Sequence, residues 1–417
     1  MTLILKNIHK LYRVAQQGER FKTGAAMSDA VCLEQAWLAV EAGRITAFGQ
    51  MDAFPHEAYA GAETIDCTGK LVMPGFVDSH THLVFPKTRE QEFVYRLQGI
   101  SYEEIAKRGG GILNSAKATQ QISEEQLLAE TLERAREIIS LGTTTVEIKS
   151  GYGLTLDSEL KLLRVAKKVQ QEMPLRVKTT FLGAHAIPVE WQSNRQGYID
   201  LVCEEMLPQV IEEGLADYID VFCDTGFFTV EETEYILQKG LDAGLPAKIH
   251  ANELDFSGGV QVGVKMGAYS VDHLERSGPD EIEALKGSET VPTLLPSVAF
   301  FLGIDYGPAR GMIEAELPLA LATDYNPGSS PGGSMPFVMS LACLGMRMLP
   351  EEALVASTLN AAFSMRMSEE IGSIEVGKYA DLVITRPMDQ LARIPYSYAQ
   401  NPVETTIING KVVHTTR

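Results

Sequence analysis

Two histidines, His80 and His82, end an apolar run that has Pro74 and Gly75 near its start. Successive side chains of a β-strand point to opposite faces, so both imidazoles share one face and Thr81 points away from it. Two imidazoles on one face at a strand end can bind a single metal ion. The motif therefore predicts a metal centre, and it directs the search for further ligands to the ends of other strands.

Strand-like and helix-like segments alternate along residues 71–368. Helical stretches separate most of the strand-like runs, a pattern typical of an α/β fold with a (β/α)8 barrel. A doubly wound open sheet is the alternative, but it would not bring eight strand ends to one mouth. The apolar or β-branched runs lie at 71–79, 143–149, 176–184, 217–223, 246–251, 269–273, 289–295 and 318–323.

The clearest helix is expected over residues 124–141. Ser123 can cap its start, Gln126 can complete a capping box, and Gly142 can end it. Apolar side chains recur along it at helical spacing and form one face: Leu127, Leu128, Leu132, Ala135, Ile138 and Ile139.

Both ends of the chain hold short strand-like runs joined by turns. Glu41-Ala42-Gly43 separates two such runs near the N-terminus, and Asn409-Gly410 indicates a hairpin near the C-terminus. We predict that residues 1–70 and 369–417 form one small β-sandwich domain beside a barrel domain of residues 71–368.

Catalytic groups of such barrels lie at the C-terminal ends of the strands. A lone histidine is more often a packed or surface residue, but five of the chain's eight histidines fall on these predicted ends. The eighth run leads to an aspartate. Three neutral imidazoles and one carboxylate suit zinc, iron or manganese. We infer the ligand set His80, His82, His250 and Asp324.

Glu253 lies three residues after His250 and can turn over a metal-bound water. A carboxylate there can take a proton from the water and pass it to a leaving nitrogen. An acid that stabilises a helix N-terminus is the alternative interpretation. Asp324 can also accept a hydrogen bond from the water, while His185 and His273 remain to polarise a substrate oxygen or bind its ring.

A pocket at this mouth needs groups that recognise a substrate. Arg89 follows the two histidines closely, and a guanidinium can hold a carboxylate through two hydrogen bonds, although a solvated surface arginine is the alternative. Tyr102 and Tyr152 follow the first and second strands and could contact a small ring or pack in the core. Residues 109–111 are all glycine but lack the pattern of a phosphate-binding loop.

Residues 74–82, with His250, His273 and Asp324, resemble the amidohydrolase superfamily. Longer segments at 147–154, 181–185, 249–253 and 322–328 are similar to one family within it, which opens the ring of 4-imidazolone-5-propanoate in histidine degradation. The similarity covers nearly the whole chain. It implies a barrel with a small β domain, and hydrolysis of that cyclic amide to N-formimidoyl-L-glutamate.

The resemblance also implies roles for single residues. Zinc or iron would be held by the four ligands inferred above, Glu253 would be the acid/base, and His273 or His185 would steady the developing oxyanion. Arg89 would hold the propionate tail. Further positions match those that the family uses for substrate or product: Arg89, Tyr102, Tyr152, His185, Asn326, Gly328 and Ser329.

Related hydrolases with two metals carry a carboxylated lysine or a glutamate at the end of the fourth strand. Residues 220–224 have no lysine, and Lys149 lies on the second strand, where a structural role is expected. We therefore predict one metal ion per subunit.

Charge and composition narrow the partners. A formal net charge of −19 argues against nucleic acid, whose phosphates require Lys and Arg, and against anionic membrane surfaces. No apolar run of about 18 residues is present, and the N-terminus does not resemble a secretory signal. We expect a cytoplasmic enzyme for a small molecule with a carboxylate tail, and the resemblance suggests a homodimer.

Two other functions remain open. An aminohydrolase acting on a nucleobase or related amidine would use a similar metal site, but it would release ammonia and need no cation for a tail. A non-catalytic scaffold on the same fold would typically lack the metal ligands, all four of which are present here.

Overall fold

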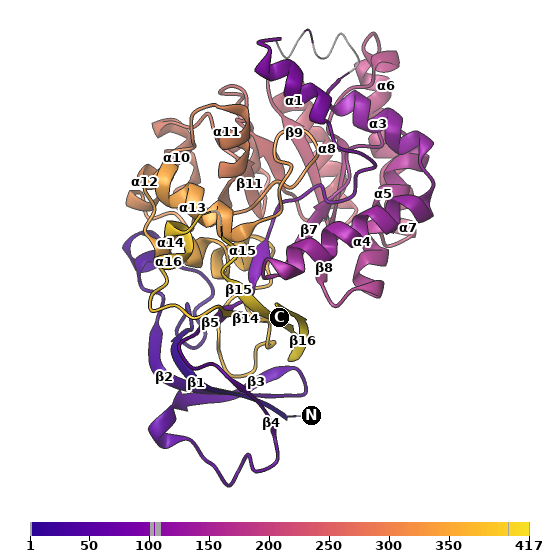
Figure 1. The fold of residues 1–417 in the computed structure, drawn as a ribbon. Helices are drawn as coiled ribbons and strands as arrows, with labels where there is room; N and C mark the ends of the chain where they lie inside the picture. Colours follow the sequence, from indigo (N-terminus) through magenta and orange to yellow (C-terminus); the bar gives the residue numbers. More distant parts are fainter. Residues whose placement is uncertain (1, 101–103, 105–109, 399, 417) are drawn as a thin grey trace.

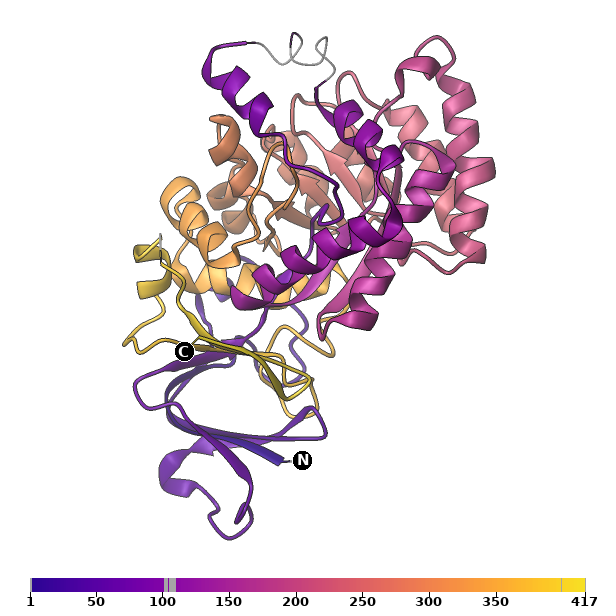
Figure 2. The same ribbon diagram turned by 45° about the vertical axis from the view of Figure 1, so that its right-hand side comes forward.

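The computed structural model describes residues 2–100, 104, 110–398 and 400–416. Within these residues, two eight-stranded sheets organise the chain (Figure 1). One sheet is a parallel barrel surrounded by helices. The other is a mixed sheet, and both chain termini lie within it (Figure 2). The separate sheet built from both chain ends confirms that part of the predicted architecture.

The barrel strands pair in parallel in the order of the sequence, from β6 to β13. Thr81 and Tyr325 form a parallel bridge between the segments that follow the first and last strands. The Asp78 carboxylate accepts hydrogen bonds from Thr323 N (3.0 Å) and Thr323 Oγ1 (2.6 Å) across the same junction. The two edges therefore meet, and the predicted (β/α)8 barrel is confirmed. Its strands are β6 (Phe76–Asp78), β7 (Thr143–Lys149), β8 (Arg176–Ala184), β9 (Tyr218–Cys223), β10 (Ile249–Ala251), β11 (Ser270–His273), β12 (Val291–Leu294) and β13 (Ala320–Leu321).

Helices cover the outside of the barrel, and α1 lies at the top of the view in Figure 1. The longer helices pack with apolar side chains on the strands, as expected for βα units. The α-helices of the described residues are α1 (Glu90–Leu97), α3 (Ile112–Gln121), α4 (Glu124–Ser140), α5 (Leu156–Glu172), α6 (Arg195–Asp200), α7 (Leu207–Glu212), α8 (Val230–Asp242), α9 (Gly259–Lys265), α10 (Pro279–Leu285), α11 (Pro296–Leu302), α12 (Ala309–Glu314), α13 (Met335–Met346), α14 (Pro350–Ala356), α15 (Leu359–Ser364) and α16 (Arg393–Tyr396).

Helix α4 matches its prediction except at the cap. Ser123 Oγ accepts a hydrogen bond from Gln126 N at 3.2 Å. The Gln126 side chain donates to Glu130 (3.2 Å) instead of reaching back to the cap, so the expected capping box forms only in part. Gly142 has φ +93°, a conformation that glycine adopts without strain, where the chain turns into β7.

The mixed sheet joins strands from both chain ends along one hydrogen-bonded path. That path runs β16 (Lys411–Thr415), β15 (Val403–Ile408), β14 (Leu382–Thr385), β5 (Leu71–Pro74), β1 (Thr2–Tyr12), β2 (Cys32–Glu41) and β3 (Arg44–Gln50), and β4 (Glu63–Asp66) pairs with β1. Buried aliphatic side chains from both ends, among them Leu5, Leu38 and Leu382, pack together in its core.

The single strand expected over 71–79 is wrong, because β5 and β6 belong to different sheets. β5 pairs with β1 and β14, whereas β6 pairs with β7. Between them, Gly75 N donates to Asp381 O at 2.9 Å. A Cβ at position 75 would overlap the Thr144 side chain, so glycine permits this close passage. The predicted division into domains at residues 70 and 368 stays a prediction.

In the described parts of the chain, no helix has the length and apolar character needed to span a membrane.

Candidate active site

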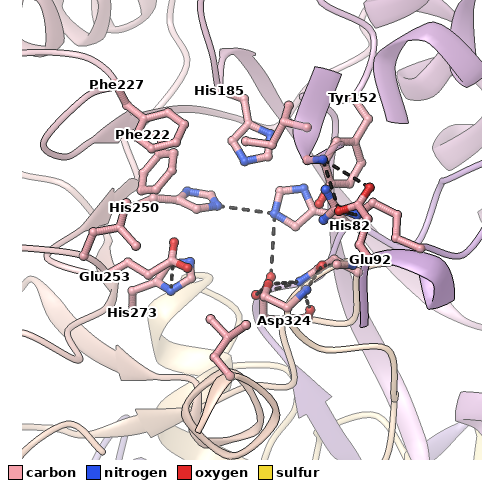
Figure 3. A pocket seen from close by; sticks show the side chains of 18 of the residues that line it. His82, Glu92, Tyr152, His185, Phe222, Phe227, His250, Glu253, His273 and Asp324 are labelled. Atoms are coloured by element: carbon pink, nitrogen blue, oxygen red, sulfur yellow. Dashed lines mark hydrogen bonds and ion pairs between the residues drawn. The ribbon is translucent and has the colours of Figure 1, made fainter. Parts of the chain in front are cut away.

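The ends of the first and last barrel strands bring His80, His82 and Asp324 together. Asp324 N donates to His80 O, and His82 N donates to Tyr325 O, both at 3.0 Å. Oδ1 of Asp324 consequently lies 3.4 Å from His80 Nε2 and 3.7 Å from His82 Nε2. His250, at the end of β10, places its Nε2 3.3 Å from His82 Nε2. All four side chains are buried, and Figure 3 shows three of them, His82, His250 and Asp324, around one cavity.

Two buried aspartates fix the rings of His80 and His250. Oδ2 of Asp272 lies 2.7 Å from His80 Nδ1, and Oδ1 of Asp220 lies 3.0 Å from His250 Nδ1. A carboxylate can only accept, so Nδ1 carries the proton in each ring and Nε2 is left with a free lone pair toward the cavity.

Backbone carbonyls of the loop after β7 do the same for two other rings. Ser150 O lies 3.2 Å from His82 Nδ1, and Gly151 O lies 2.9 Å from His185 Nδ1. The rings of His82 and His185 stack with centroids 5.1 Å apart. These imidazoles therefore also present Nε2 to the cavity.

On the side away from the cavity, the two aspartates contact a buried cluster of charged side chains. Lys149 Nζ lies 2.7 Å from Asp220, 3.4 Å from Asp272 and 2.6 Å from Glu147. Lys248 pairs with Glu147 as well. Burial alone lowers the pKa of Lys149, but Asp220, Glu147 and Asp272 outweigh it and raise that pKa, so the lysine stays cationic. Each aspartate thus bonds one ammonium and one imidazole.

The donor atoms in this cavity fit a metal ion. His80 Nε2 and Asp324 Oδ1 are buried and have no hydrogen-bond partner among the described residues. Burial, with neighbouring positive charge, lowers the pKa of His80, His82 and His250 far below the usual range, so these rings are neutral, the form that binds metals. Three buried groups have ligand atoms within 4.8 Å of one another: His80–His82–Asp324, His82–His185–His250 and His80–His250–His273.

His273, at the end of β11, lies between two carboxylates. Its Nδ1 is 3.7 Å from Glu253 and 3.4 Å from Glu275. Burial alone lowers the pKa of His273, but these carboxylates raise it to about 10. Burial is the main cause that raises the pKa of Glu253 to about 7. The pair can therefore hold a proton at the edge of the cavity.

Several site residues occupy strained backbone conformations at the strand ends. Asn252, His273 and Asp324 have φ of +57°, +85° and +52°, a region that residues with a Cβ seldom adopt. Such strain is characteristic of functional sites, where surrounding contacts hold the chain in place.

Arg89 lies in the cavity wall against Gly328. A Cβ at position 328 would overlap the Arg89 guanidinium, so glycine makes room for it. The guanidinium carbon lies 6.0 Å from the Tyr152 ring centroid, and Arg89 Nε pairs with Glu92 at 4.0 Å. Arg96 approaches the same loop, with a 3.1 Å hydrogen bond to Gly328 O.

Asn326 and Ser329 organise the loop after Asp324. The Asn326 amide donates to Asp324 Oδ2 (2.8 Å) and to Ser329 Oγ (2.8 Å). Its carbonyl accepts from the backbone N–H groups of Gly328 (2.7 Å) and Ser329 (2.9 Å). This loop therefore ties Asp324 to the part of the wall that holds Arg89.

Comparison with known proteins decides the family. The sequence matches the amidohydrolase family over residues 71–413. It is 49% identical to the imidazolonepropionase of Flavobacterium johnsoniae over 413 residues, which are 99% of this chain and 100% of that protein. The chain belongs to the imidazolonepropionase family. Identity to the imidazolonepropionase of Shouchella clausii is 46%, over 99% of this chain and 92% of that one.

More distant solved structures share the fold. Guanine deaminase from E. coli has a TM-score of 0.75 at 15% identity and full coverage of both chains. Atrazine chlorohydrolase from Arthrobacter aurescens, solved in complex with zinc, has a TM-score of 0.71 at 15% identity, over 99% of this chain and 95% of that one. At these identities the likeness concerns the fold alone, and it agrees with the barrel described above.

The cavity brings together nearly all of the residues singled out in the sequence of this imidazolonepropionase family member. Tyr102 lies outside the described residues. The other twelve lie at the cavity or beside it: His80, His82, Arg89, Tyr152, His185, His250, Glu253, His273, Asp324, Asn326, Gly328 and Ser329.

Sequence reasoning missed the buried charges below the cavity and Glu275 beside His273. Glu147, Asp220, Lys248 and Asp272 all lie in or next to strands that were expected to be apolar. Central strands of a parallel sheet are normally apolar, so a charge inside such a run is a signal of a buried partner. That signal was available in the sequence.

Replacing Lys149 with Met should lower the free energy of unfolding by about 3–5 kcal/mol, because it leaves buried carboxylates without their cation. Thermal unfolding measures the effect. Replacing Lys168 with Met on the surface of α5, where the lysine pairs with Glu124, is the control and should change the melting temperature far less. Equal melting temperatures for the two variants would contradict a structural role for Lys149.

Proposed function

We propose that this chain hydrolyses 4-imidazolone-5-propanoate to N-formimidoyl-L-glutamate. The observation that carries this is 49% identity to an imidazolonepropionase over 99% of the chain. The buried cluster of histidines and aspartate supports it, since it can hold a metal ion beside a cavity. The proposed reaction consumes one water: its oxygen bonds to the ring carbonyl carbon, the C–N bond beside that carbon breaks, and the ring nitrogen takes a proton.

His80, His82, His250 and Asp324 would hold one zinc or iron ion per subunit. Such an ion supplies an activated water near neutral pH and polarises the ring carbonyl. The aspartates behind His80 and His250 would keep these rings in the tautomer that binds it.

Glu253 would move the proton from the water to the leaving ring nitrogen. Its carboxylate borders the cavity and contacts His273, so it can exchange protons with groups at the reacting carbon. Asp324 would also accept a hydrogen bond from the water. Together with His273 these residues form the proposed catalytic group.

His273 is the better candidate to steady the negative charge that develops on the carbonyl oxygen. Glu253 and Glu275 hold it cationic, whereas burial lowers the pKa of His185 to about 4 and leaves that ring neutral. A cationic donor stabilises an oxyanion more strongly than a neutral one. His185 would then bind the substrate ring.

Arg89 would bind the carboxylate of the propionate tail. It is a cation in the wall of a cavity in a chain of net charge −19. Tyr152 would contact the ring, and Asn326, Gly328 and Ser329 would offer polar groups to substrate or product. Tyr102, the homodimer and the cytoplasmic location stay predictions.

Removal of the metal tests the proposed function directly. Purified protein should consume 4-imidazolone-5-propanoate, lose that activity after treatment with a chelator, and regain it with zinc or iron. The product should have the mass of N-formimidoyl-L-glutamate, and no ammonia should appear. Equal rates before and after chelation would contradict the proposal. Release of ammonia from purine or pyrimidine bases, without imidazolone turnover, would favour an aminohydrolase.

Replacing Glu253 with Gln should lower kcat by about 10²–10⁴-fold and change KM little, because it removes a proton transfer in the transition state. Steady-state kinetics on the metal-loaded enzyme measure this. Asp255→Asn, an exposed change two residues away, is the matched control and should keep the activity of the unsubstituted enzyme. A Glu253→Gln variant with normal kcat would remove Glu253 from the mechanism.

A further inference from the structure

The loop after β7 wraps around a buried carboxylate that belongs to α5. Glu159 is fully buried and accepts hydrogen bonds from three backbone N–H groups: Gly151 (2.9 Å), Gly153 (2.7 Å) and Leu154 (2.8 Å). Burial raises the pKa of Glu159, and the hydrogen bonds from Ser150 and from these backbone groups oppose that rise. Charge-assisted bonds of this kind are about twice as strong as neutral ones.

The conformation of this loop needs such an anchor. Gly151 has φ +102° and Leu154 has φ +57°, and the latter is strained for a residue with a Cβ. At Gly153 a Cβ would lie 2.5 Å from Glu159 N, so the loop sits directly against the first turn of α5. Without an acceptor for its three N–H groups, the buried loop would be destabilised by unpaired donors as well as by backbone strain.

The same loop reaches three parts of the active site. Ser150 O bonds His82, and Gly151 O bonds His185. The Tyr152 ring lies 5.2 Å from the His82 ring and 5.3 Å from the His185 ring. In Figure 3, Tyr152 lies beside His82 on the cavity wall opposite Glu253. A shift of the loop would therefore move Tyr152 and His185 together.

We propose that Glu159 is a positioning residue, which holds the loop of residues 150–154 so that Tyr152 and His185 meet the substrate ring. The inference rests on the proposed function, because it assigns Glu159 to substrate binding in that same site. Glu159 itself does not line the cavity, and it acts only through the loop. Its removal should therefore weaken substrate binding more than it slows the chemical step.

Glu159→Gln is the first test, since the amide keeps the size of the side chain but replaces one acceptor oxygen with a donor. One backbone N–H, that of Gly151, loses its partner if the amide nitrogen replaces Oε2, and two, those of Gly153 and Leu154, lose theirs if it replaces Oε1. We expect KM for 4-imidazolone-5-propanoate to rise about tenfold or more, and kcat to fall less than about threefold. The metal content per chain should stay unchanged, because Ser150, whose carbonyl contacts His82, is also held on β8 by bonds from Ser150 N to Thr180 O (3.0 Å) and from Leu182 N to Ser150 Oγ (2.9 Å).

Asp157→Asn is the matched control. It removes the same charge from the first turn of the same helix, but Asp157 is exposed and makes no hydrogen bond to the loop among the described residues. Its KM should stay within about twofold of the unsubstituted enzyme, since surface changes of this kind have small effects. An equal rise in KM for both variants would overturn the proposal in favour of a general charge effect.

A double-mutant cycle with Tyr152→Ala separates positioning from simple destabilisation. If Glu159 acts through Tyr152, the double variant should have a KM close to that of Tyr152→Ala alone. Multiplicative effects of the two changes would overturn the proposal. If Glu159→Gln does not fold, Gly153→Ala displaces the same loop from α5 without changing charge, and an unchanged KM in that variant would overturn it.

Failure of the inference and failure of the proposed function give different results. Absence of imidazolone turnover in both the unsubstituted enzyme and Asp157→Asn would contradict the proposed function. Normal turnover in both, with the kinetics of Glu159→Gln unchanged, would contradict only the role of Glu159.

Discussion

The site depends on a buried lysine that lies between two aspartates and, with Lys248, offsets part of their negative charge. Lys149 lies at the centre of the barrel. Asp220 contacts it through Oδ2 and His250 through Oδ1, whereas Asp272 contacts both Lys149 and His80 through Oδ2. Two carboxylates this deep could not both ionise without a cation, because burial and mutual repulsion favour their neutral forms. Lys149 and Lys248 favour their charged forms, and the carboxylates fix which nitrogen of His80 and His250 faces the cavity.

At the rim of the cavity, backbone groups and a glycine position the side chains. In the interior, charged side chains do so. Glycine at position 328 leaves space for the Arg89 guanidinium, and the loop around Glu159 brings carbonyl oxygens to His82 and His185. Imidazoles on three different strand ends therefore present the same nitrogen inward.

Much of the site could be predicted from the sequence because chemistry-bearing residues stand at strand ends. His80, His82, His250 and Asp324 follow buried runs, and parallel strands in a barrel bring such ends to one mouth. The runs at 143–149 and 176–184 match β7 and β8 at both ends. The run at 71–79 failed, because an apolar pattern does not reveal that Gly75 passes the chain from one sheet to another.

The supporting residues escaped prediction for a different reason. Asp220, Lys248 and Asp272 act by pairing with residues on other strands. Which residues pair depends on the strand register across the barrel, and the sequence of one strand does not contain that register. Glu159 is similar: on its helix it looks like an acid in the first turn, and only the fold brings residues 151–154 around it.

The zinc affinity of Asp272→Asn tests the role of the buried charges most directly. A competition titration against a chromophoric chelator gives the dissociation constant without reference to activity. An asparagine keeps an acceptor for His80 but loses the charge shared with Lys149. If Asp272 orients His80 as a ligand, the dissociation constant should rise about 10–100-fold over that of the unsubstituted protein. An unchanged dissociation constant in a variant that folds normally would contradict this role.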